Sequence, residues 1–478
     1  MKLAKALLER WCREEPSRLL KTALRQAERL EEMAGELEHL RAENAFLTKR
    51  IEAKTKRITE LEKALEEATR AAFRQAAPFR IEEKKRAAAP KGPGRKEGHP
   101  GAFRQRPDPI DEEIEVELCC CPHCGGTQFH DQSEVEQFIE DIPPIGPRVM
   151  RLRTYQASCA RCGQQVSSTH PLQMSLATGA AGVHLGPRAL AIAADLNKAK
   201  GLSMRKTCAV LGDCFGLRLT PGGLSQALAR MANRVEPEYE KLATQVRDSQ
   251  LVHSDETSWW VGGSGWWLWV FANKETTYYL VGKSRGRDVI LEVLGADYQG
   301  VLVSDCLCIY DDVSPLQQKC YSHHHKAIAE AKSIHPQDGE GYLNQLAALL
   351  RAATALKEQK AEIAPESFRS LRAALQRNAE KLLETPRSQP QEESVRMRLF
   401  KQRDHLFTFL DHDEVDATNN LAERQLRPAV IARKISCGNK TANGARTWQI
   451  LASLAATCAQ RAKSFIATLA RAAPLQGR

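Results

Sequence analysis

The sequence predicts a multidomain α+β protein. Heptad-spaced leucines and isoleucines indicate a long helix near the N-terminus, two CxxC pairs indicate a small metal-bound module, and β-rich runs from residue 250 onward indicate a sheet. The chain has 478 residues, which is too many for one compact core. Several modules are therefore expected along it.

The composition limits the protein's surroundings and partners. Lys and Arg number 69 against 59 Asp and Glu, a net charge of +10 that permits a polyanionic partner and equally suits an ordinary basic protein. The first residues become charged too early for a signal segment, and no apolar run approaches the roughly 18 residues of a membrane span. We therefore expect a cytoplasmic protein without membrane contact, in which clustered cysteines bind metal and do not form disulfides.

Residues 20–75 are predicted to form a leucine-zipper coiled coil. The first apolar row of the heptads consists of Leu30, Leu37, Asn44, Ile51, Ile58 and Leu65, and the second of Met33, Leu40, Leu47, Leu61 and Ala68. An asparagine in the first row, followed by β-branched isoleucines, favours two strands in a fixed register. The expected partner is a second copy, in a homodimer or higher oligomer. The alternative is a single amphipathic helix packed onto its own domain.

Two modules follow. Residues 76–112 are rich in Lys, Arg, Pro and Gly and are predicted to form a basic linker, which either follows phosphates or is merely flexible. Residues 113–170 contain CPHC and CARC, whose spacing lets two thiolates of each pair reach one ion. The strand-like runs 134–142 and 148–159 predict a zinc ribbon with structural Zn²⁺. Its expected ligands are Cys121, Cys124, Cys159 and Cys162, with Cys119, Cys120 and His123 as neighbouring alternatives.

Residues 180–240 are predicted to form a helical connector. Short helical runs are separated by Gly, Ser and Thr-Pro, an arrangement similar to helix-turn-helix, with Thr220 as an N-cap and Pro221 at the first helical position. A plain helical bundle is the alternative.

From residue 248 to 445 the pattern predicts an RNase H-like catalytic domain. Three β-rich runs, a helical run and a fully apolar strand follow one another, which is the order that opens this fold. Asp255 lies in the first strand, Asp305 follows the fourth, and Glu423 lies on a much later helix. Nearby acids compete for these roles: Glu256, Asp311 and Asp312. A helical insertion is expected at about 330–412, and a C-terminal helical segment at 446–478.

The three separated carboxylates predict metal-dependent phosphoryl transfer. Mg²⁺, or Mn²⁺ in its place, prefers hard oxygen ligands, and two ions about 3.5–4 Å apart can stabilise both the attacking and the leaving oxygen of an in-line displacement. Asp255 is expected to bridge the ions, and Asp305 and Glu423 to flank them. Each acid taken alone is an ordinary residue, so the prediction depends on their combination.

The segment around Glu423 adds polar and basic residues. Asn419 and Asn420 precede Glu423 by four and three residues and are expected on its helix face. Pro428 predicts a bend or a helix end. The cations expected to hold DNA phosphates are Arg424, Arg427, Arg433 and Lys434. The alternative reading of these charges is surface ion pairing, which contributes little to stability.

The motif NNLAERQLRP resembles the NNxAERxLRP signature of the insertion sequence 66 family of bacterial DDE transposases. SDETSWWVGG, GVLVSDC and QKCYSH are similar to that family's other blocks and occur in the same order, as do the zipper, the KGPGRKEGHPG linker and the paired cysteines. The resemblance implies Asp255, Asp305 and Glu423 as the catalytic triad and His323 as an auxiliary residue. The chain departs from the family pattern at Cys306, Cys308, His324 and His325.

The predicted function is therefore DNA transposition. Such an enzyme binds the ends of its own element in double-stranded DNA, cleaves strands and joins them to a target, in the nucleoid-associated cytoplasm of a bacterium. The family resemblance implies accessory proteins encoded by the same element. One alternative is a non-catalytic, dimeric zinc-ribbon DNA-binding regulator, in which the acids are scaffold. A host nuclease with an RNase H-like core is the other.

Overall fold

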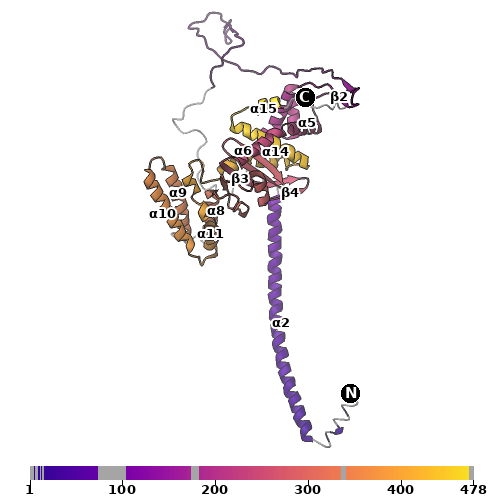
Figure 1. The fold of residues 1–478 in the computed structure, drawn as a ribbon, viewed down its shortest axis with the longest axis vertical. Helices are drawn as coiled ribbons and strands as arrows, with labels where there is room; N and C mark the ends of the chain where they lie inside the picture. The colour runs from indigo at the N-terminus through magenta and orange to yellow at the C-terminus, as the bar shows by residue number, and fades with distance from the viewer. Residues whose placement is uncertain are drawn as a thin grey trace. The chain divides into compact units, whose positions relative to one another are not determined.

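The computed structural model describes residues 16–73, 104–173, 182–334 and 341–472, together with Lys5, Glu9, Arg10 and Cys12. The chain forms two compact units, residues 1–116 and 117–478, each of which is described by itself. The architecture mixes helix and sheet, as the sequence predicts (Figure 1). Among the described helices, none is both long and apolar enough to cross a membrane.

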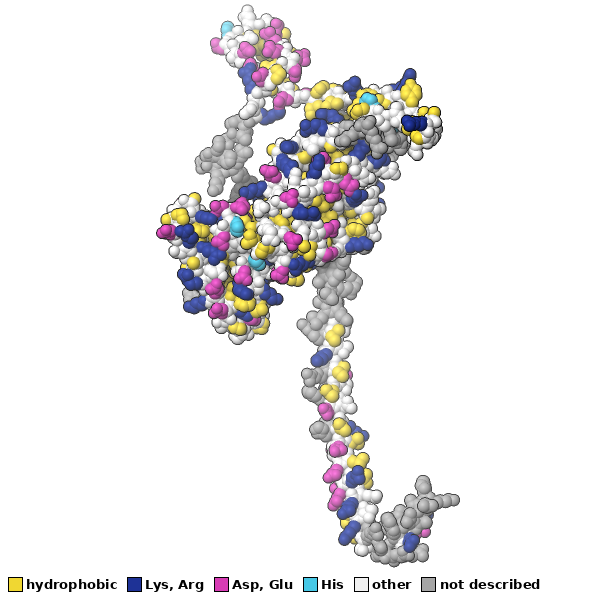
Figure 2. All heavy atoms as spheres, in the orientation of Figure 1, with side chains coloured by type: hydrophobic (Ala, Val, Ile, Leu, Met, Phe, Trp, Pro, Cys, Tyr) yellow, Lys and Arg dark blue, Asp and Glu magenta, His cyan; other side chains and the backbone are white. Residues whose placement is uncertain are grey.

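The first unit contains one long helix, α2 (Pro16–Phe73), of 58 residues. The heptad side chains remain exposed along it: Leu30 66%, Met33 58%, Leu37 50%, Leu40 58%, Leu47 43%, Ile51 63% and Ile58 55%. Figure 2 shows hydrophobic side chains among charged ones along this helix. Leu61, Leu65 and Ala68 have side chains outside the described set.

The second unit begins with an extended segment and one small hairpin. β1 (Gln156–Ser158) pairs antiparallel with β2 (Gln165–Ser167), on either side of the second CxxC pair. The strand expected at 134–142 is absent, and of the run 148–159 only β1 is a strand. The apolar side chains of the missing strands, such as Val135, Ile139 and Val149, are exposed and have no core to pack against. Most of the basic linker lies outside the described residues.

The connector is helical and packs against the sheet. Its elements are α3 (Pro187–Ala194), the π-helical turn η2 (Asp195–Ala199), α4 (Met204–Phe215), α5 (Pro221–Arg234) and α6 (Glu236–Arg247). The Thr220 hydroxyl accepts from the Gly223 amide and caps α5, as predicted. Leu190, Leu224 and Met231 share one buried core with Trp269 and Phe271 of the sheet. The connector is therefore part of the same compact unit as the sheet and not a separate domain.

Five strands form the central sheet, in the order β5-β4-β3-β6-β7. The elements are β3 (Leu251–Val261), β4 (Ser264–Ala272), β5 (Thr277–Gly282), α7 (Arg287–Leu294), β6 (Val301–Ser304) and β7 (Gln317–Lys319). β3, β4 and β5 are antiparallel neighbours, whereas β6 is parallel to β3 and β7 is parallel to β6. Three meandering strands, a helix and a parallel strand follow one another as predicted.

Alternation along β3 sends its side chains to two different layers. Trp259 and Val261 belong to the core formed with α13 (Asn420–Ser436) and α14 (Ala442–Gln460). Val252 points to the opposite core, which includes α7 and the connector helices. The strand is therefore covered on both faces, and each residue's odd or even position decides which layer it meets.

Helix α14 covers the edge strand β5. The Thr457 hydroxyl accepts the Thr277 amide over 3.1 Å, and the Ser453 hydroxyl accepts the Tyr279 amide over 2.9 Å. The Gln449 side chain accepts the Val281 amide over 2.9 Å. The predicted domain boundary at 445 therefore falls inside a helix that belongs to the sheet. The last described helix is α15 (Phe465–Ala472).

The insertion between β7 and α13 is helical, as predicted. It comprises α8 (Tyr321–Ile334), α9 (Tyr342–Glu358), α10 (Pro365–Glu384), α11 (Pro390–Lys401), η4 (Arg403–His405) and α12 (Thr408–Asp411). Its helices α8 to α11 gather beside the sheet (Figure 1). Their core includes Leu346, Leu350 and Leu399 and continues into Val301 and Val303 of β6. The insertion is thus anchored directly behind the strand that leads to Asp305.

Candidate active site

The parallel pairing of β3 and β6 places Asp255 and Asp305 at the same level. Leu251 pairs with Val301 and His253 with Val303, so continuing this register by two residues sets Asp255 beside Asp305. Neighbouring strands lie about 4.8 Å apart. Asp305 follows the last residue of β6 and its carboxylate accepts the Leu307 amide over 2.9 Å. The two aspartates therefore meet where a buried strand emerges.

Glu423 approaches the aspartates on the first turn of α13. Asp255 is largely buried, and burial raises its pKa to about 7, with further increases from the negative charges of Glu256, Asp305 and Glu423. The negative charges of Asp305 and Glu423 also both raise the pKa of His323. The three predicted carboxylates are therefore close enough that their charges interact. Because Glu423 is exposed, the cluster is open to solvent from the side of α13.

Asn419 fixes the start of α13 against β3. Its side-chain amide donates to the Ser254 carbonyl over 2.8 Å, and its side-chain oxygen lies 3.2 Å from Nδ1 of His253. Its own carbonyl accepts the Glu423 amide over 3.1 Å, so Asn419 stands at the N-cap. Asn419 is fully buried, whereas Asn420 is exposed. The prediction that both share the face of Glu423 is therefore wrong for Asn419, because that residue precedes the helix and turns inward.

Glu256, a competitor for the catalytic role, lies on the opposite face of β3. Its side chain is only 2% exposed. Arg285 donates to one carboxylate oxygen from two nitrogens, over 3.1 and 2.8 Å, and the Tyr310 hydroxyl donates to the other over 2.7 Å. The guanidinium of Arg285 also lies 4.3 Å from the ring centre of Trp267. These contacts satisfy Glu256 inside the fold and direct it away from the cluster.

Asp311 is also held by internal partners. Its carboxylate accepts the Gln402 side-chain amide over 2.9 Å and lies 3.8 Å from Nζ of Lys319. Lys319 is fully buried, and its ammonium donates to the Ser304 hydroxyl over 3.2 Å, directly before Asp305. The buried ammonium of Lys319 therefore lies next to the acidic cluster, on the interior side of Asp305.

The basic residues of α13 have different surroundings. One guanidinium nitrogen of Arg433 donates to the Thr257 hydroxyl over 3.1 Å, to the Ser258 hydroxyl over 2.8 Å and to the Ser258 carbonyl. Arg433 thus ties α13 to β3. Arg424, Arg427 and Lys434 are exposed. Arg427 and Lys434 follow Glu423 by 4 and 11 residues, which places both on its helical face.

Pro428 does not end the helix. The helix α13 continues without interruption from Asn420 to Ser436, and Pro428 lies on its exposed side. The ring therefore faces solvent and meets no neighbour of the core, while the carbonyl of Arg424 loses its usual helical donor. The expected helix end at Pro428 is wrong, and the basic residues beyond it remain on the same rod as Glu423.

The predicted auxiliary residue His323 lies beside Cys320 and Glu423. One ligand atom from each of the three lies within 4.8 Å of the other two. The neighbouring Cys320 sulfur raises the pKa of His323, and the charges of Asp305 and Glu423 add to the increase. Sequence reasoning missed Cys320, although its three-residue spacing from His323 on a helix start was visible.

Two of the residues that depart from the family pattern contact each other. Sγ of Cys306 lies 3.6 Å from Nε2 of His324, and His324 is buried. Burial lowers the pKa of His324 to about 3, so its ring is neutral near pH 7. The thiol and the neutral ring therefore pack together as a polar pair beside Asp305.

Each CxxC pair forms the same tight turn. In the first, the Cys121 amide donates to the Gly126 carbonyl and the Gly125 amide to the Cys121 carbonyl, both over 2.8 Å. Cys159, Gly163 and Gln164 repeat this pattern. Hydrogen bonds from the backbone that follows lower the pKa of Cys121 and of Cys159. Across the described residues, the two pairs do not meet in a group of three or more ligands.

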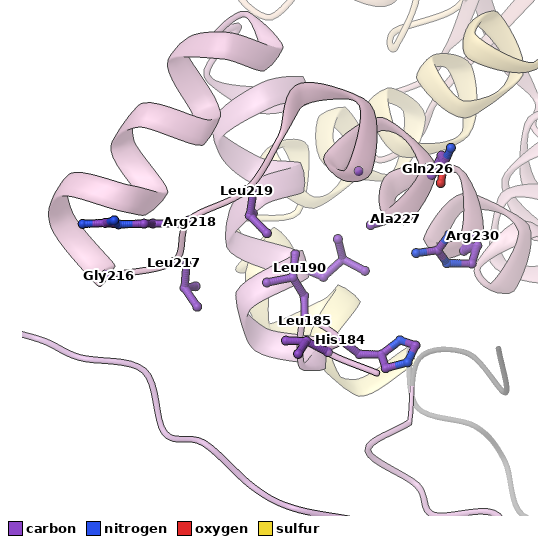
Figure 3. A pocket seen from close by; sticks show the side chains of 12 residues that line it. His184, Leu185, Leu190, Gly216, Leu217, Arg218, Leu219, Gln226, Ala227 and Arg230 are labelled. Carbon is purple, nitrogen blue, oxygen red and sulfur yellow. The ribbon is translucent and has the colours of Figure 1, made fainter. Parts of the chain in front are cut away.

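A cavity of about 410 Å³ lies elsewhere, in the connector. Leu185, Leu190 and Leu219 surround it, with His184 and Arg230 on one side (Figure 3). It lies between α3, α5 and the turn that joins α4 to α5, and none of the acidic cluster lines it. It contributes nothing to the chemistry of the carboxylates.

Comparison with known proteins identifies the class. Residues 182–447, more than half of the chain, match the family described as "Transposase IS66 family". The chain is also 24% identical over 388 residues to the uncharacterized protein y4qI of Sinorhizobium fredii (strain NBRC 101917 / NGR234), over 73% of this chain and 69% of that protein.

The protein therefore belongs to the IS66 family of transposases. The family implies a DNA-processing enzyme that binds DNA. The matched region includes the connector, the sheet, the helical insertion and α13, and so contains Asp255, Asp305 and Glu423.

Proposed function

We propose that this transposase cleaves and joins DNA strands at the cluster of Asp255, Asp305 and Glu423, in an RNase H-like DDE domain. The observation that carries the proposal is that the charges of Asp305, after β6, and Glu423, on α13, help to raise the pKa of Asp255 on β3, so the three carboxylates lie near one another. Their mutual repulsion and the burial of Asp255 are costly for folding, as its pKa of about 7 indicates. Such a cost is typical of catalytic sites.

The donor set fits magnesium or manganese. Three carboxylates offer hard oxygen ligands and a negative charge that a divalent cation neutralises. Bound ions would activate the attacking water or DNA 3′-hydroxyl and stabilise the leaving oxygen. Asp255, Asp305 and Glu423 would hold the ions, and the Asn419 contacts with β3 would position the start of the helix that carries Glu423.

Exposed cations on α13 support a path for the DNA backbone. Arg427 and Lys434 lie on the same stripe as Glu423, and Arg424 lies on the neighbouring one. Phosphates that follow this stripe would be held beside the carboxylates. Arg433 is assigned to anchoring α13, because its guanidinium already donates to Thr257 and Ser258.

The N-terminal parts are assigned to assembly and DNA-end binding. The exposed heptad row of α2 supports pairing with a second copy, as a homodimer or higher oligomer. The four cysteines of the two turns, Cys121, Cys124, Cys159 and Cys162, would hold one structural Zn²⁺ when the turns come together. A site closed by four thiolates stabilises a fold and does not catalyse. Accessory proteins of the same element would complete the complex.

Replacing Glu423 by glutamine tests the catalytic assignment. The substrate is a DNA duplex carrying the inverted repeats that flank the gene. Glu423→Gln is expected to abolish Mg²⁺-dependent cleavage and strand joining and to leave end binding intact. The matched control Glu414→Gln, at an exposed site before α13, is expected to cleave normally. Cleavage by Glu423→Gln at the wild-type rate would contradict the assignment.

The same assay separates the alternatives. If the protein is a non-catalytic zinc-ribbon regulator, both the wild type and Glu423→Gln would bind the DNA ends and neither would cleave them. A host nuclease would cut the duplex but never join a strand to a target. Strand joining by the wild-type protein therefore distinguishes transposition from both.

A further inference from the structure

A second group of potential metal ligands adjoins the acidic cluster. Cys320, His323 and Glu423 each offer one ligand atom, all within 4.8 Å of one another. Among the described residues, this is the one group of three or more His, Cys, Asp or Glu side chains whose ligand atoms lie close enough together to hold an ion. Glu423 thus belongs to both arrangements.

The fold brings these three ligands together from two helix starts. Cys320 directly precedes α8, and its amide donates to the Ser304 carbonyl over 2.9 Å. The Tyr321 amide donates to the Ala417 carbonyl over 2.9 Å, which joins the start of α8 to the loop before α13. His323 lies in the first turn of α8 and Glu423 in the first turn of α13. The packing of the two helix starts therefore determines how far apart the three ligand residues lie. Their proximity is not a chance encounter of mobile surface side chains.

The polar atoms of the group leave room for a ligand. Nδ1 of His323 is buried and has no hydrogen-bond partner among the described residues. A buried ring nitrogen without a partner is costly. The Cys320 sulfur is fully buried and accepts the Asn419 amide over 3.3 Å. Glu423 is exposed, so a cation can enter from its side.

We infer that Cys320, His323 and Glu423 form a binding site for a borderline-soft divalent cation of the zinc type, which inhibits the enzyme by occupying Glu423. Sulfur, imidazole nitrogen and carboxylate oxygen are the ligands that Zn²⁺ accepts, whereas Mg²⁺ disfavours thiolate. Mutual separations within 4.8 Å are of the order expected for ligand atoms that lie about 2.0–2.3 Å from one ion.

The inhibition follows from the shared ligand and depends on the proposed function. A zinc ion on Glu423 would turn this carboxylate toward Cys320 and His323 and would place another positive charge beside Asp255 and Asp305, so magnesium would bind more weakly there. Zinc and magnesium therefore compete through Glu423, and the zinc-bound protein would retain the DNA-binding surface while losing strand cleavage.

Zinc stoichiometry of the full-length protein tests the site without DNA. Wild-type protein is expected to hold one more zinc equivalent than Cys320→Ser, whereas Cys458→Ser, which alters another buried free cysteine, holds as much as wild type. His323→Gln provides a second variant, and melting curves show which variants are folded. Equal zinc content in wild type, Cys320→Ser and His323→Gln would overturn the inference.

Cleavage assays then test the inhibition. Zinc is titrated into Mg²⁺-dependent cleavage, and each variant is compared with its own zinc-free rate. Half-inhibition of Cys320→Ser is expected to need at least about tenfold more zinc than that of wild type. Equal inhibition of wild type and Cys320→Ser would assign the effect to another site and overturn the inference. If wild type cleaves under no condition, the proposed function fails, while the stoichiometry still decides whether the site exists.

Discussion

The side-chain amide of Asn419 donates a hydrogen bond of 2.8 Å to the backbone carbonyl of Ser254, the residue before Asp255. The carbonyl of Asn419 in turn accepts the amide of Glu423. One asparagine therefore links the strand that carries the first carboxylate to the helix that carries the third. The spacing between these carboxylates depends on this residue.

Asn419→Ala is expected to destabilise the protein and to weaken cleavage. The substitution leaves the buried Ser254 carbonyl without its donor and Nδ1 of the buried His253 without its partner, at a cost of roughly 1–3 kcal/mol. Chemical unfolding and the dependence of the cleavage rate on Mg²⁺ concentration measure the two effects. Asn420→Ala, at the exposed neighbouring position, is the matched control and should change stability by less than about 0.5 kcal/mol. Equal behaviour of the two variants would contradict a positioning role for Asn419.

Asp255→Asn is expected to stabilise the metal-free protein above neutral pH. The unfolded chain releases the Asp255 proton at about pH 4, whereas the folded state holds it up to about pH 7, because of burial and the neighbouring Glu256. The folded state therefore binds more protons in this window, and stability falls as the pH rises through it. Asparagine cannot ionise, so the stability of the variant does not fall in this way as the pH rises.

Melting temperatures in the presence of a chelator measure the effect between about pH 5 and pH 8. Asp255→Asn should melt several degrees higher than wild type at the upper end and show a smaller difference at the lower end. Asp297→Asn, at an exposed position, is the control. Parallel pH profiles for wild type and Asp255→Asn would refute the prediction. Adding Mg²⁺ should raise the melting temperature of wild type more than that of Asp255→Asn.

The adjacent cations Arg433 and Lys434 of α13 should have different roles: Arg433 stabilises the fold, and Lys434 contacts DNA. Arg433→Ala removes the donors to Thr257 and Ser258, so it should lower the melting temperature. Lys434→Ala removes an exposed charge, so it should leave stability unchanged, weaken DNA binding and reduce the salt dependence of binding by about one ion. Calorimetry and binding at several salt concentrations measure both. A Lys434→Ala protein with unaltered salt dependence would exclude this lysine from the interface.

Polar substitutions in the heptad row of α2 should dissociate the oligomer. Leu37 and Leu40 are 50% and 58% exposed in the single chain, so glutamine at both positions costs nothing in the monomer and removes apolar burial between copies. Sedimentation velocity should show a shift toward monomer for the double variant. Glu38→Gln, outside the apolar rows, should sediment as wild type. If the double variant keeps the wild-type mass, assembly occurs through another surface.

Local patterns were sufficient to predict much of this fold. The β-rich runs predicted the three meandering strands, and the apolar run before Asp305 predicted β6, because strand periodicity and buried runs are local signals. Asp305 could be selected because it directly follows an apolar strand, and Asp255 because it follows an apolar run, although the structure places Asp255 within β3. The proposed role of Glu423 rests on a motif resemblance, since the helix that carries it lies about 120 residues beyond Asp305.

Other features depend on contacts that no local pattern contains. Asp255 and Glu256 are adjacent acids on opposite faces of β3, and the packing of Arg285 and Tyr310 shows that Glu256 is satisfied inside the fold. Asn419 looked like a helix-face residue, but the turn before α13 directs it inward. Pro428 is compatible with a continuous helix because its ring faces solvent. Each outcome depends on which layer covers a given side, which is a tertiary property.

The contacts between α14 and β5 have a consequence for assembly. Every fourth residue of a helix rises about 6 Å, and every second residue of a strand about 6.8 Å, so the two repeats stay in step over a short distance. Gln449, Ser453 and Thr457 use this near match to occupy alternate amides of β5. The outer margin of the sheet is thereby closed to strand addition by another molecule. A chain truncated before Ala442 would present that margin bare and would be prone to aggregate, whatever remained of its carboxylates.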